Sequence, residues 1–179
     1  LTRSRGLGDV YKRQVIFDAG DDPSGAELAA INPKVGGNIT LANNAQTFTG
    51  SASDLKAAFN GGLQGTQTGN VTISDTSGNI AATTLTDITS ETNGTVTAAS
   101  AGITITGNST QLTAALVTAE TKAVMANGDV TITDTGTVDA TVLSGIGNIT
   151  GGTVTATGAL TITGTTAESV SYTHLTLPT

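Results

Sequence analysis

The feature that most constrains this chain is a block of text that occurs more than once along its 179 residues. Residues 129–164 read DVTITDTGTVDATVLSGIGNITGGTVTATGALTITG, and residues 70–107 read NVTISDTSGNIAATTLTDITSETNGTVTAASAGITITG. Part of the block also occurs at 37–50, as GNITLANNAQTFTG. A chain made of one repeated unit buries its apolar residues mainly against neighbouring units, so the sequence predicts an array.

Short strands are predicted where apolar residues alternate with threonine, as in 130–133 and 161–163. Successive side chains of a strand point to opposite faces of its sheet. Valine and isoleucine should therefore point inward, and the β-branched threonines should occupy the exposed face.

Helices are predicted where leucine and alanine recur at helical spacing, at 51–59 and from 107 through 125. A less regular helical pattern, rich in threonine, covers 81–88. Ser109 or Thr110 is the expected N-cap of the long helix, and the expected C-terminal stop is Asn127 followed by glycine.

The predicted fold is a mainly β repeat solenoid of parallel stacked strands, with short helices on some coils. The solenoid should cover 37–169, with a period of about 57–59 residues, which is long for a single coil. Each period should contain two unequal coils of about 23 and 35 residues. Residues 15–36 are expected to be a lead-in to the repeats. The alternative fold is a set of antiparallel β-sandwich repeats, for which this period would be short.

The two ends of the chain differ from its middle. Residues 1–14 and 170–179 contain all the arginines, both tyrosines and the single histidine, His174. Both ends resemble peptides that arise when sequencing-adapter DNA is translated at the ends of metagenomic fragments, RGLGDVYKRQ in front and SYTHLTLPT behind. We therefore expect neither flank to contribute to the fold or to a site.

Composition excludes several functions. The chain has no cysteine, so it has no disulfides and no thiolate ligands. Residues 15–169 contain three lysines, no arginine and thirteen acidic residues, a net charge of −10 that should repel nucleic acid and anionic membranes. No apolar run is long enough for a membrane helix. We expect no enzyme, because the repeats contain no converging set of titratable groups.

Calcium is the one cofactor that the sequence suggests, and only as an alternative. Asp75 and Asp134 occupy equivalent positions in the repeats, and stacking could place them in a row of carboxylates that binds Ca²⁺. In the other interpretation, each side chain bonds to nearby backbone N–H groups in an Asx turn. Asp18, Asp21 and Asp22 form a second acidic cluster, which is either a cation site or a solvated turn.

Pairs of threonines spaced two apart suggest an exposed surface array. Stacked strands would repeat such pairs about every 4.7–4.9 Å, and a flat array at this pitch resembles the ice-binding face of some solenoid antifreeze proteins. The simpler interpretation is that threonine suits exposed strand positions. The array would comprise Thr95, Thr97, Thr104, Thr106, Thr131, Thr133, Thr153, Thr155, Thr161 and Thr163.

The phrases TVTAASAGITITG, VTITDTGTVDATVLSGI and TGSASDLKAAF resemble tandem repeats of very large secreted or surface adhesin-like proteins of marine bacteria, cyanobacteria among them. The resemblance implies an extracellular structural or adhesive role and carries over no catalytic residues. The implied partners are adjacent repeats of a longer chain, with surface glycans or other cells as further partners. The alternative function is an ice-binding solenoid.

Overall fold

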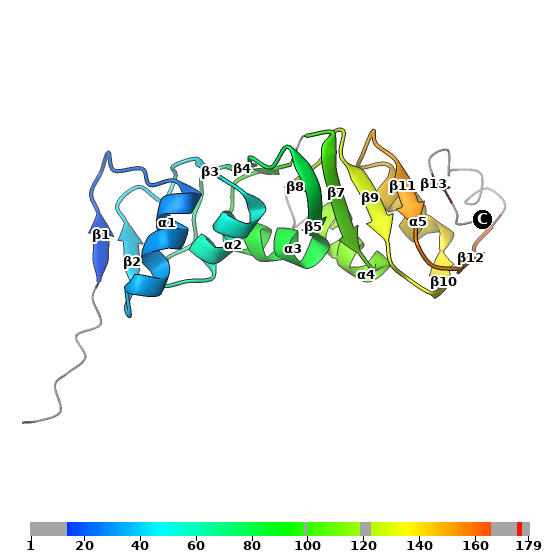
Figure 1. The fold of residues 1–179 in the computed structure, drawn as a ribbon, viewed down its shortest axis with the longest axis horizontal. Helices are drawn as coiled ribbons and strands as arrows, with labels where there is room; N and C mark the ends of the chain where they lie inside the picture. Colours follow the sequence, from blue (N-terminus) through cyan, green and yellow to red (C-terminus); the bar gives the residue numbers. More distant parts are fainter. Residues whose placement is uncertain (1–13, 99, 119–122, 166–174, 177–179) are drawn as a thin grey trace, which may run out of the picture.

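Parallel strands and short helices alternate along the chain, in a mixed α/β arrangement that extends along one axis (Figure 1). The computed structural model describes residues 14–98, 100–118, 123–165 and 175–176. The remaining residues, which include His174 and most of both flanks, lie outside the described part.

Strands in the described residues are short, and most have two to four residues. They are β1 (Val15–Phe17), β2 (Ile39–Leu41), β3 (Phe48–Gly50), β4 (Val71–Ile73), β5 (Ser77–Ala81), β6 (Val96–Thr97), β7 (Gly102–Gly107), β8 (Ala123–Val124), β9 (Asp129–Ile132), β10 (Gly136–Asp139), β11 (Val154–Ala156), β12 (Leu160–Thr163) and β13 (Leu175–Thr176).

Every pairing between these strands is parallel. One sheet has the order β3-β4-β6-β8, a second has the order β13-β11-β9-β7-β5, and β1-β2 and β10-β12 form two-stranded sheets. Partners lie at regular steps along the chain, as in the pairs Phe48↔Val71, Val71↔Val96 and Ile105↔Val130. The alternative of antiparallel sandwich repeats is therefore wrong for the described residues.

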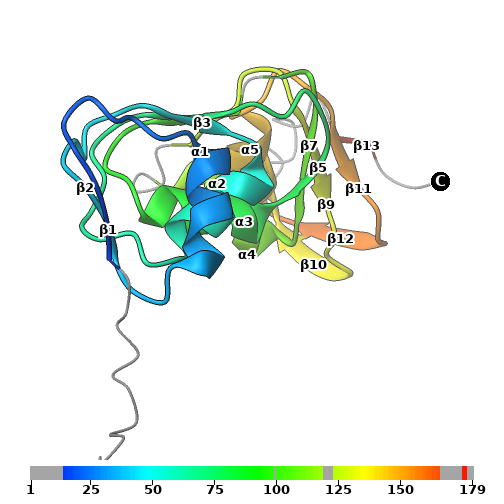
Figure 2. The same ribbon diagram turned by 60° about the vertical axis from the view of Figure 1, so that its left-hand side comes forward.

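The described residues form five α-helices, which follow one another in sequence order along the long axis (Figure 1) and lie on the same side of the molecule (Figure 2). They are α1 (Gly25–Ile31), α2 (Ala52–Phe59), α3 (Ala82–Ser90), α4 (Ser109–Leu112) and α5 (Ala140–Gly147), with a 3-10 turn, η1 (Asn32–Lys34), after α1. Successive helices begin about 30 residues apart, a common length for one structural repeat. Two such steps make up the period seen in the sequence. One period therefore contains two units, which are closer to equal in length than the two coils expected.

We use "unit" for one helix together with the strands that precede it. Unit 1 contains β1 and α1, unit 2 contains β2, β3 and α2, and unit 3 contains β4, β5 and α3. Unit 4 contains β6, β7 and α4, and unit 5 contains β8, β9, β10 and α5. The strands β11 and β12 begin the next unit. The segment expected as a lead-in thus contains unit 1, whose strand pairs with β2 and whose helix packs on α2.

The helix expected from 107 through 125 is shorter. Asn108, and not Ser109 or Thr110, is the N-cap, because its side chain accepts a hydrogen bond from the Gln111 N–H. After α4 the backbone forms a π-helical turn, η2 (Thr113–Val117), which closes when the Thr118 N–H donates to the Thr113 carbonyl. Residues 123–124, which were expected to be helical, instead form β8, because they pair with β6 as a strand.

Part of the C-terminal flank belongs to a sheet, contrary to the expectation that it stays outside the fold. β13 pairs in parallel with β11, with Val154 opposite Leu175 and Thr155 opposite Thr176. Backbone hydrogen bonds are available at any exposed strand edge, so pairing there does not require a repeat sequence.

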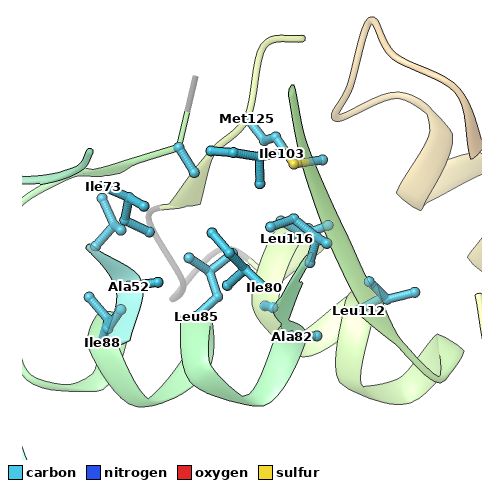
Figure 3. Close-up of a cluster of buried hydrophobic side chains, with 14 of the residues drawn as sticks. Ala52, Ile73, Ile80, Ala82, Leu85, Ile88, Ile103, Leu112, Leu116 and Met125 are labelled. Atoms are coloured by element: carbon cyan, nitrogen blue, oxygen red, sulfur yellow. The ribbon is translucent and has the colours of Figure 1, made fainter. Parts of the chain in front are cut away.

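The expected alternation of side chains within strands is confirmed. In β7 and β9 the apolar residues Ile103, Ile105, Val130 and Ile132 are fully buried, and the threonines between them are partly exposed. Apolar side chains of the helices point toward apolar side chains of the strands, as Leu85 of α3 and Ile80 of β5 do (Figure 3). The core is therefore a continuous cluster of mainly aliphatic side chains, with Phe48 and Phe59 among them, that extends from unit to unit.

Candidate functional site

The polar groups that recur in the repeats meet at the boundaries between units. Asp75 lies just after β4 in unit 3, and its Oδ2 accepts a hydrogen bond from the Ala52 N–H at 2.7 Å. Ala52 is the first residue of α2, in the preceding unit. The first N–H groups of a helix have no partner within the helix, and this end carries a partial positive charge. A carboxylate from the next unit therefore satisfies the start of α2.

Asp134 makes the equivalent contact one period later. Its Oδ2 accepts from the Ser109 N–H at 2.5 Å, and its Oδ1 accepts from the Ser109 hydroxyl at 2.9 Å. Ser109 begins α4, so this carboxylate also binds the helix of the preceding unit. Asp75 and Asp134 therefore bind the starts of two different helices, α2 and α4, and α3 lies between these helices along the chain.

Asp75 and Asp134 act as hydrogen-bond acceptors for helix starts in this structure, and the calcium row that the sequence offers as an alternative stays a prediction. A cation would need several oxygen ligands around one point, but the hydrogen bonds of both residues join carboxylate oxygens to N–H and O–H donors. Within residues 14–98, 100–118, 123–165 and 175–176, no group of three acidic, histidine or cysteine side chains is close enough to hold a metal. The local Asx turn, which the sequence favoured, is not what the hydrogen bonds of these two residues form, because their carboxylate oxygens accept from donors in the preceding unit.

A second contact occurs twice: it joins the turn before β6 to the turn before β4, and the turn before β11 to the turn before β9. The Thr92 hydroxyl donates to the Gly69 carbonyl at 2.7 Å and accepts from the Gly94 N–H at 2.9 Å. At the equivalent position, the Thr150 hydroxyl donates to the Gly128 carbonyl and accepts from the Gly152 N–H at 2.9 Å. Both threonines are buried.

A third repeated contact lies beside the second. The Asn70 Oδ1 accepts from the Thr95 N–H at 2.9 Å, and the Asp129 Oδ1 accepts from the Thr153 N–H at 2.7 Å. Sequence reasoning missed both residues as inter-unit contacts. The available signal was that Asn70 and Asp129 precede the strand text VTI at equivalent places, one period apart.

Glycines at these turns let one unit approach the next. A Cβ atom added at Gly94 would lie 2.1 Å from the Gly69 carbonyl oxygen, and one at Gly152 would lie 2.5 Å from the Gly128 carbonyl oxygen. Earlier in the chain, a Cβ atom at Gly62 would lie 2.4 Å from the Gly37 carbonyl oxygen. Contacts this short are impossible for a side chain, so the stacking distance depends on glycine here.

The ten threonines of the expected array do not share one surface. Thr106, Thr131 and Thr155 are aligned in adjacent strands, where they form a row of three. The neighbouring row is interrupted, because Thr104 lies between Asn79 and Asp129. The others are distributed as follows: Thr97 is in the sheet of β3, β4, β6 and β8, Thr161 and Thr163 are in β12, and Thr95, Thr133 and Thr153 lie just outside strands.

The acidic turn of unit 1 borders a shallow hollow lined by Phe17, Asp21, Asp22, Pro23, Glu27 and Ile31. The Asp22 carboxylate accepts a hydrogen bond from the Asn43 amide at 3.1 Å. The Glu27 carboxylate accepts from the backbone N–H and the hydroxyl of Ser24, each at 2.8 Å. These hydrogen bonds, with the backbone one the larger cause, hold the pKa of Glu27 below its usual range.

At α5, Asp139 is the N-cap and its Oδ1 accepts from the hydroxyl and the N–H of Thr141. The hydroxyl bond, followed by the backbone bond, lowers the pKa of Asp139. Glu27 and Asp139 are both exposed, so their carboxylates stabilise helix starts at the surface.

In the part of the chain that the structure describes, no helix has the length and apolar character needed to cross a bilayer. The repeated polar residues have a common role, which is to join one unit to the next.

Comparison of the chain with protein-family models, with curated proteins and with solved structures finds no match.

Proposed function

We propose that this chain is a stretch of a repeat solenoid that serves as a structural and adhesive element of a large extracellular bacterial surface protein. The observation that carries the proposal is the recurrence of one contact, from Asp75 to α2 and from Asp134 to α4, with the sequence period. A contact that recurs at each period lets a chain grow by addition of further units.

The parallel pairing supports the solenoid architecture. The pairings among β1 to β12 all join strands of adjacent units, the helices follow in order, and apolar residues from all units form one continuous core. An object of this kind offers long sides rather than a deep cleft. We therefore propose that surface glycans or other cells would be contacted along those sides, and that adjacent repeats are the partners at the ends.

No catalytic role is part of the proposal. The carboxylates that recur in the repeats are hydrogen bonded to helix starts and turns, and residues 15–169 provide three lysines and no histidine. General acid–base chemistry requires a proton donor or acceptor that can reach a substrate.

Ice binding has less support than the structural role. The row formed by Thr106, Thr131 and Thr155 is regular, but the adjoining row contains Asn79 and Asp129. A matched ice surface would need parallel rows without such interruptions. Thermal hysteresis of the purified chain tests this alternative: a clear freezing-point depression that the Thr131→Val variant reduces would favour ice binding over adhesion.

Two measurements test the proposed function. Small-angle X-ray scattering should give an elongated particle for the monomer, and a spherical particle would contradict the solenoid. Antibodies raised against the repeats should label the outside of intact cells that carry the parent gene. Labelling only after permeabilisation would contradict the surface role while leaving the solenoid intact.

A further inference from the structure

Two strand edges at opposite ends of the described units have matching hydrogen-bonding patterns. The Val15 N–H donates to the Asn38 carbonyl, and the Phe17 carbonyl accepts from the Ala42 N–H, so these two residues bond toward β2. In a parallel ladder the residue between them points its N–H and C=O the other way. The backbone groups of Ile16 therefore face the outer edge of β1, where the described residues supply no further strand.

The last strand of the described repeats, β12, has an outer edge of the same kind. The Gly136 N–H donates to the Ala159 carbonyl, so Gly136 and Val138 bond toward β12, and Thr161 bonds back toward β10. By the same alternation, the N–H and C=O of Leu160 and Ile162 point away from β10. In the described part of the chain β12 has β10 as its partner.

Within the chain, strands equivalent to these two edges already pair with each other. Phe48 lies opposite Val71 where β3 meets β4, and Ile105 lies opposite Val130 where β7 meets β9. Ile162 is the repeat equivalent of Phe48 and Ile105. Val15, the first strand residue of unit 1, is the equivalent of Val71, the first strand residue of unit 3. The two internal pairs also have the same backbone hydrogen bonds. The Gly50 carbonyl accepts from the Ser74 N–H, and the Gly107 carbonyl accepts from the Thr133 N–H.

We propose that separate copies of this chain associate end to end, with β12 of one copy pairing in parallel with β1 of a second copy. Ile162 would lie opposite Val15 of the second copy, Thr163 opposite its Ile16, and Gly164 opposite its Phe17. This proposal rests on the repeat architecture of the proposed function. Because the two edges belong to opposite ends, the contact does not close, and copies add in a line.

Burial at the end of unit 1 supports a missing neighbour of this kind. Phe17 and Ile31 are only partly buried and line the hollow of unit 1. Their equivalents inside the array, Ile73 and Ile88, are 5% and 0% exposed because another unit covers them. A unit placed on this end would bury the same side chains and add a strand to β1.

Charge favours pairing between unlike ends over pairing between two unit 1 ends. Asp21, Asp22 and Glu27 surround the hollow, so two such ends would bring like charges together. Residues 149–165, at the other end, contain no charged side chain. The boundary between two copies would differ from the internal boundaries in one contact. Ala19 occupies the position equivalent to Asp75, so no carboxylate from the second copy would accept from a helix start of the first.

Sedimentation velocity of the full chain over a concentration series tests the proposal. The mass should rise reversibly from 17.6 kDa past that of a dimer without a plateau. Ile16→Pro removes the outward N–H while leaving the bonds of Val15 and Phe17 to β2, and should hold the mass at the monomer. Ile16→Thr is the matched control, because it keeps the N–H and restores the residue found at Thr72 and Thr131; it should assemble.

A mixing experiment separates a blocked edge from a misfolded variant. Ile162→Pro blocks the outward N–H of β12 and should also be monomeric alone. An equal mixture with Ile16→Pro should form a dimer and stop there, because each variant retains one complementary edge. A wild-type chain that stays monomeric, a plateau at the dimer, or a mixture that fails to dimerise would overturn the proposal. An elongated monomer in scattering would still support the proposed function.

Discussion

Asp134 binds the start of a helix in the unit before its own, with 2.5 Å between its Oδ2 and the Ser109 nitrogen. The Asp134→Ala variant leaves the Ser109 N–H and hydroxyl without this acceptor. We expect a loss of about 1–2 kcal/mol in the free energy of unfolding, the size typical of a lost cap or charged hydrogen bond. Urea unfolding followed by circular dichroism measures it.

The control for this prediction is the neighbouring exposed residue Thr135. Thr135→Ala changes the same turn without touching α4, and should alter the free energy of unfolding by less than about 0.5 kcal/mol. Equal losses for the two variants would show that the turn, and not the carboxylate contact, stabilises the boundary.

Thr92 is 1% exposed, and its hydroxyl both donates to Gly69 and accepts from Gly94. Thr92→Val keeps the shape but leaves a buried carbonyl and a partly buried N–H unsatisfied, at a cost of about 1–3 kcal/mol. Thr92→Ser keeps the hydroxyl and should lose less, because only a methyl group is removed. Denaturation curves that rank Ser below Val would contradict a hydrogen-bonding role.

Gly94 makes the closest approach in the turn that Thr92 stabilises, and Gly94→Ala would place a methyl group 2.1 Å from the Gly69 oxygen. Relieving that overlap requires the two units to separate, so we expect a loss of more than about 3 kcal/mol or a failure to fold. Gly147→Ala is the control, since nothing lies within 4 Å of a methyl group added there and the residue ends α5. The control should be neutral or slightly stabilising, by up to about 1 kcal/mol. Thermal melting of both variants gives the comparison.

The strand positions were predictable because their chemistry is local. Alternation of Ile105 with Thr104 and Thr106 sets the buried face whatever the neighbouring unit contains. The period was also visible in the sequence, and the helix starts reproduce it. The division of the period was harder to predict, because threonine-rich α3 has weak helix propensity and is helical through packing of Leu85 and Ile88.

The polar contacts could not be predicted, because they depend on geometry between units. The recurrence of Asp75 and Asp134 was visible, but the sequence does not show which helix start each carboxylate faces. The end of η2 at Val117 is a similar case, since helical spacing continued to 125 while pairing of β8 with β6 required extended backbone. Both errors arise where contacts with the next unit override local preference.

Acid should weaken the exposed helix starts of α1 and α5. The pKa of Glu27 and that of Asp139 are lowered in the folded chain by hydrogen bonds from Ser24 and Thr141. A carboxyl whose pKa is lower in the folded chain stabilises the fold at any pH above its unfolded pKa, which is near ~4 for a typical carboxyl. This stabilisation is lost as the pH falls through the folded pKa. Melting temperatures from pH ~6 to ~2 should therefore fall less steeply for the double variant Glu27→Gln, Asp139→Asn than for the wild type.

Ser24→Ala provides an independent check of that assignment. It removes the hydroxyl that donates to Glu27, so it should flatten the acid dependence in the same direction and by a smaller amount. An acid dependence identical in all three proteins would mean that other carboxyls control acid unfolding.

Calcium should leave the stability of the chain unchanged. Asp134 uses both carboxylate oxygens to bind Ser109, and Asp75 uses Oδ2 to bind Ala52, so a cation would have to replace hydrogen bonds that stabilise α4 and α2. A ligand specific for the folded state raises the melting temperature by mass action, so scans in excess Ca²⁺ and in chelator are a direct test. Equal melting temperatures are expected. A rise with Ca²⁺ that disappears in Asp134→Ala would instead restore the carboxylate row as a cation site.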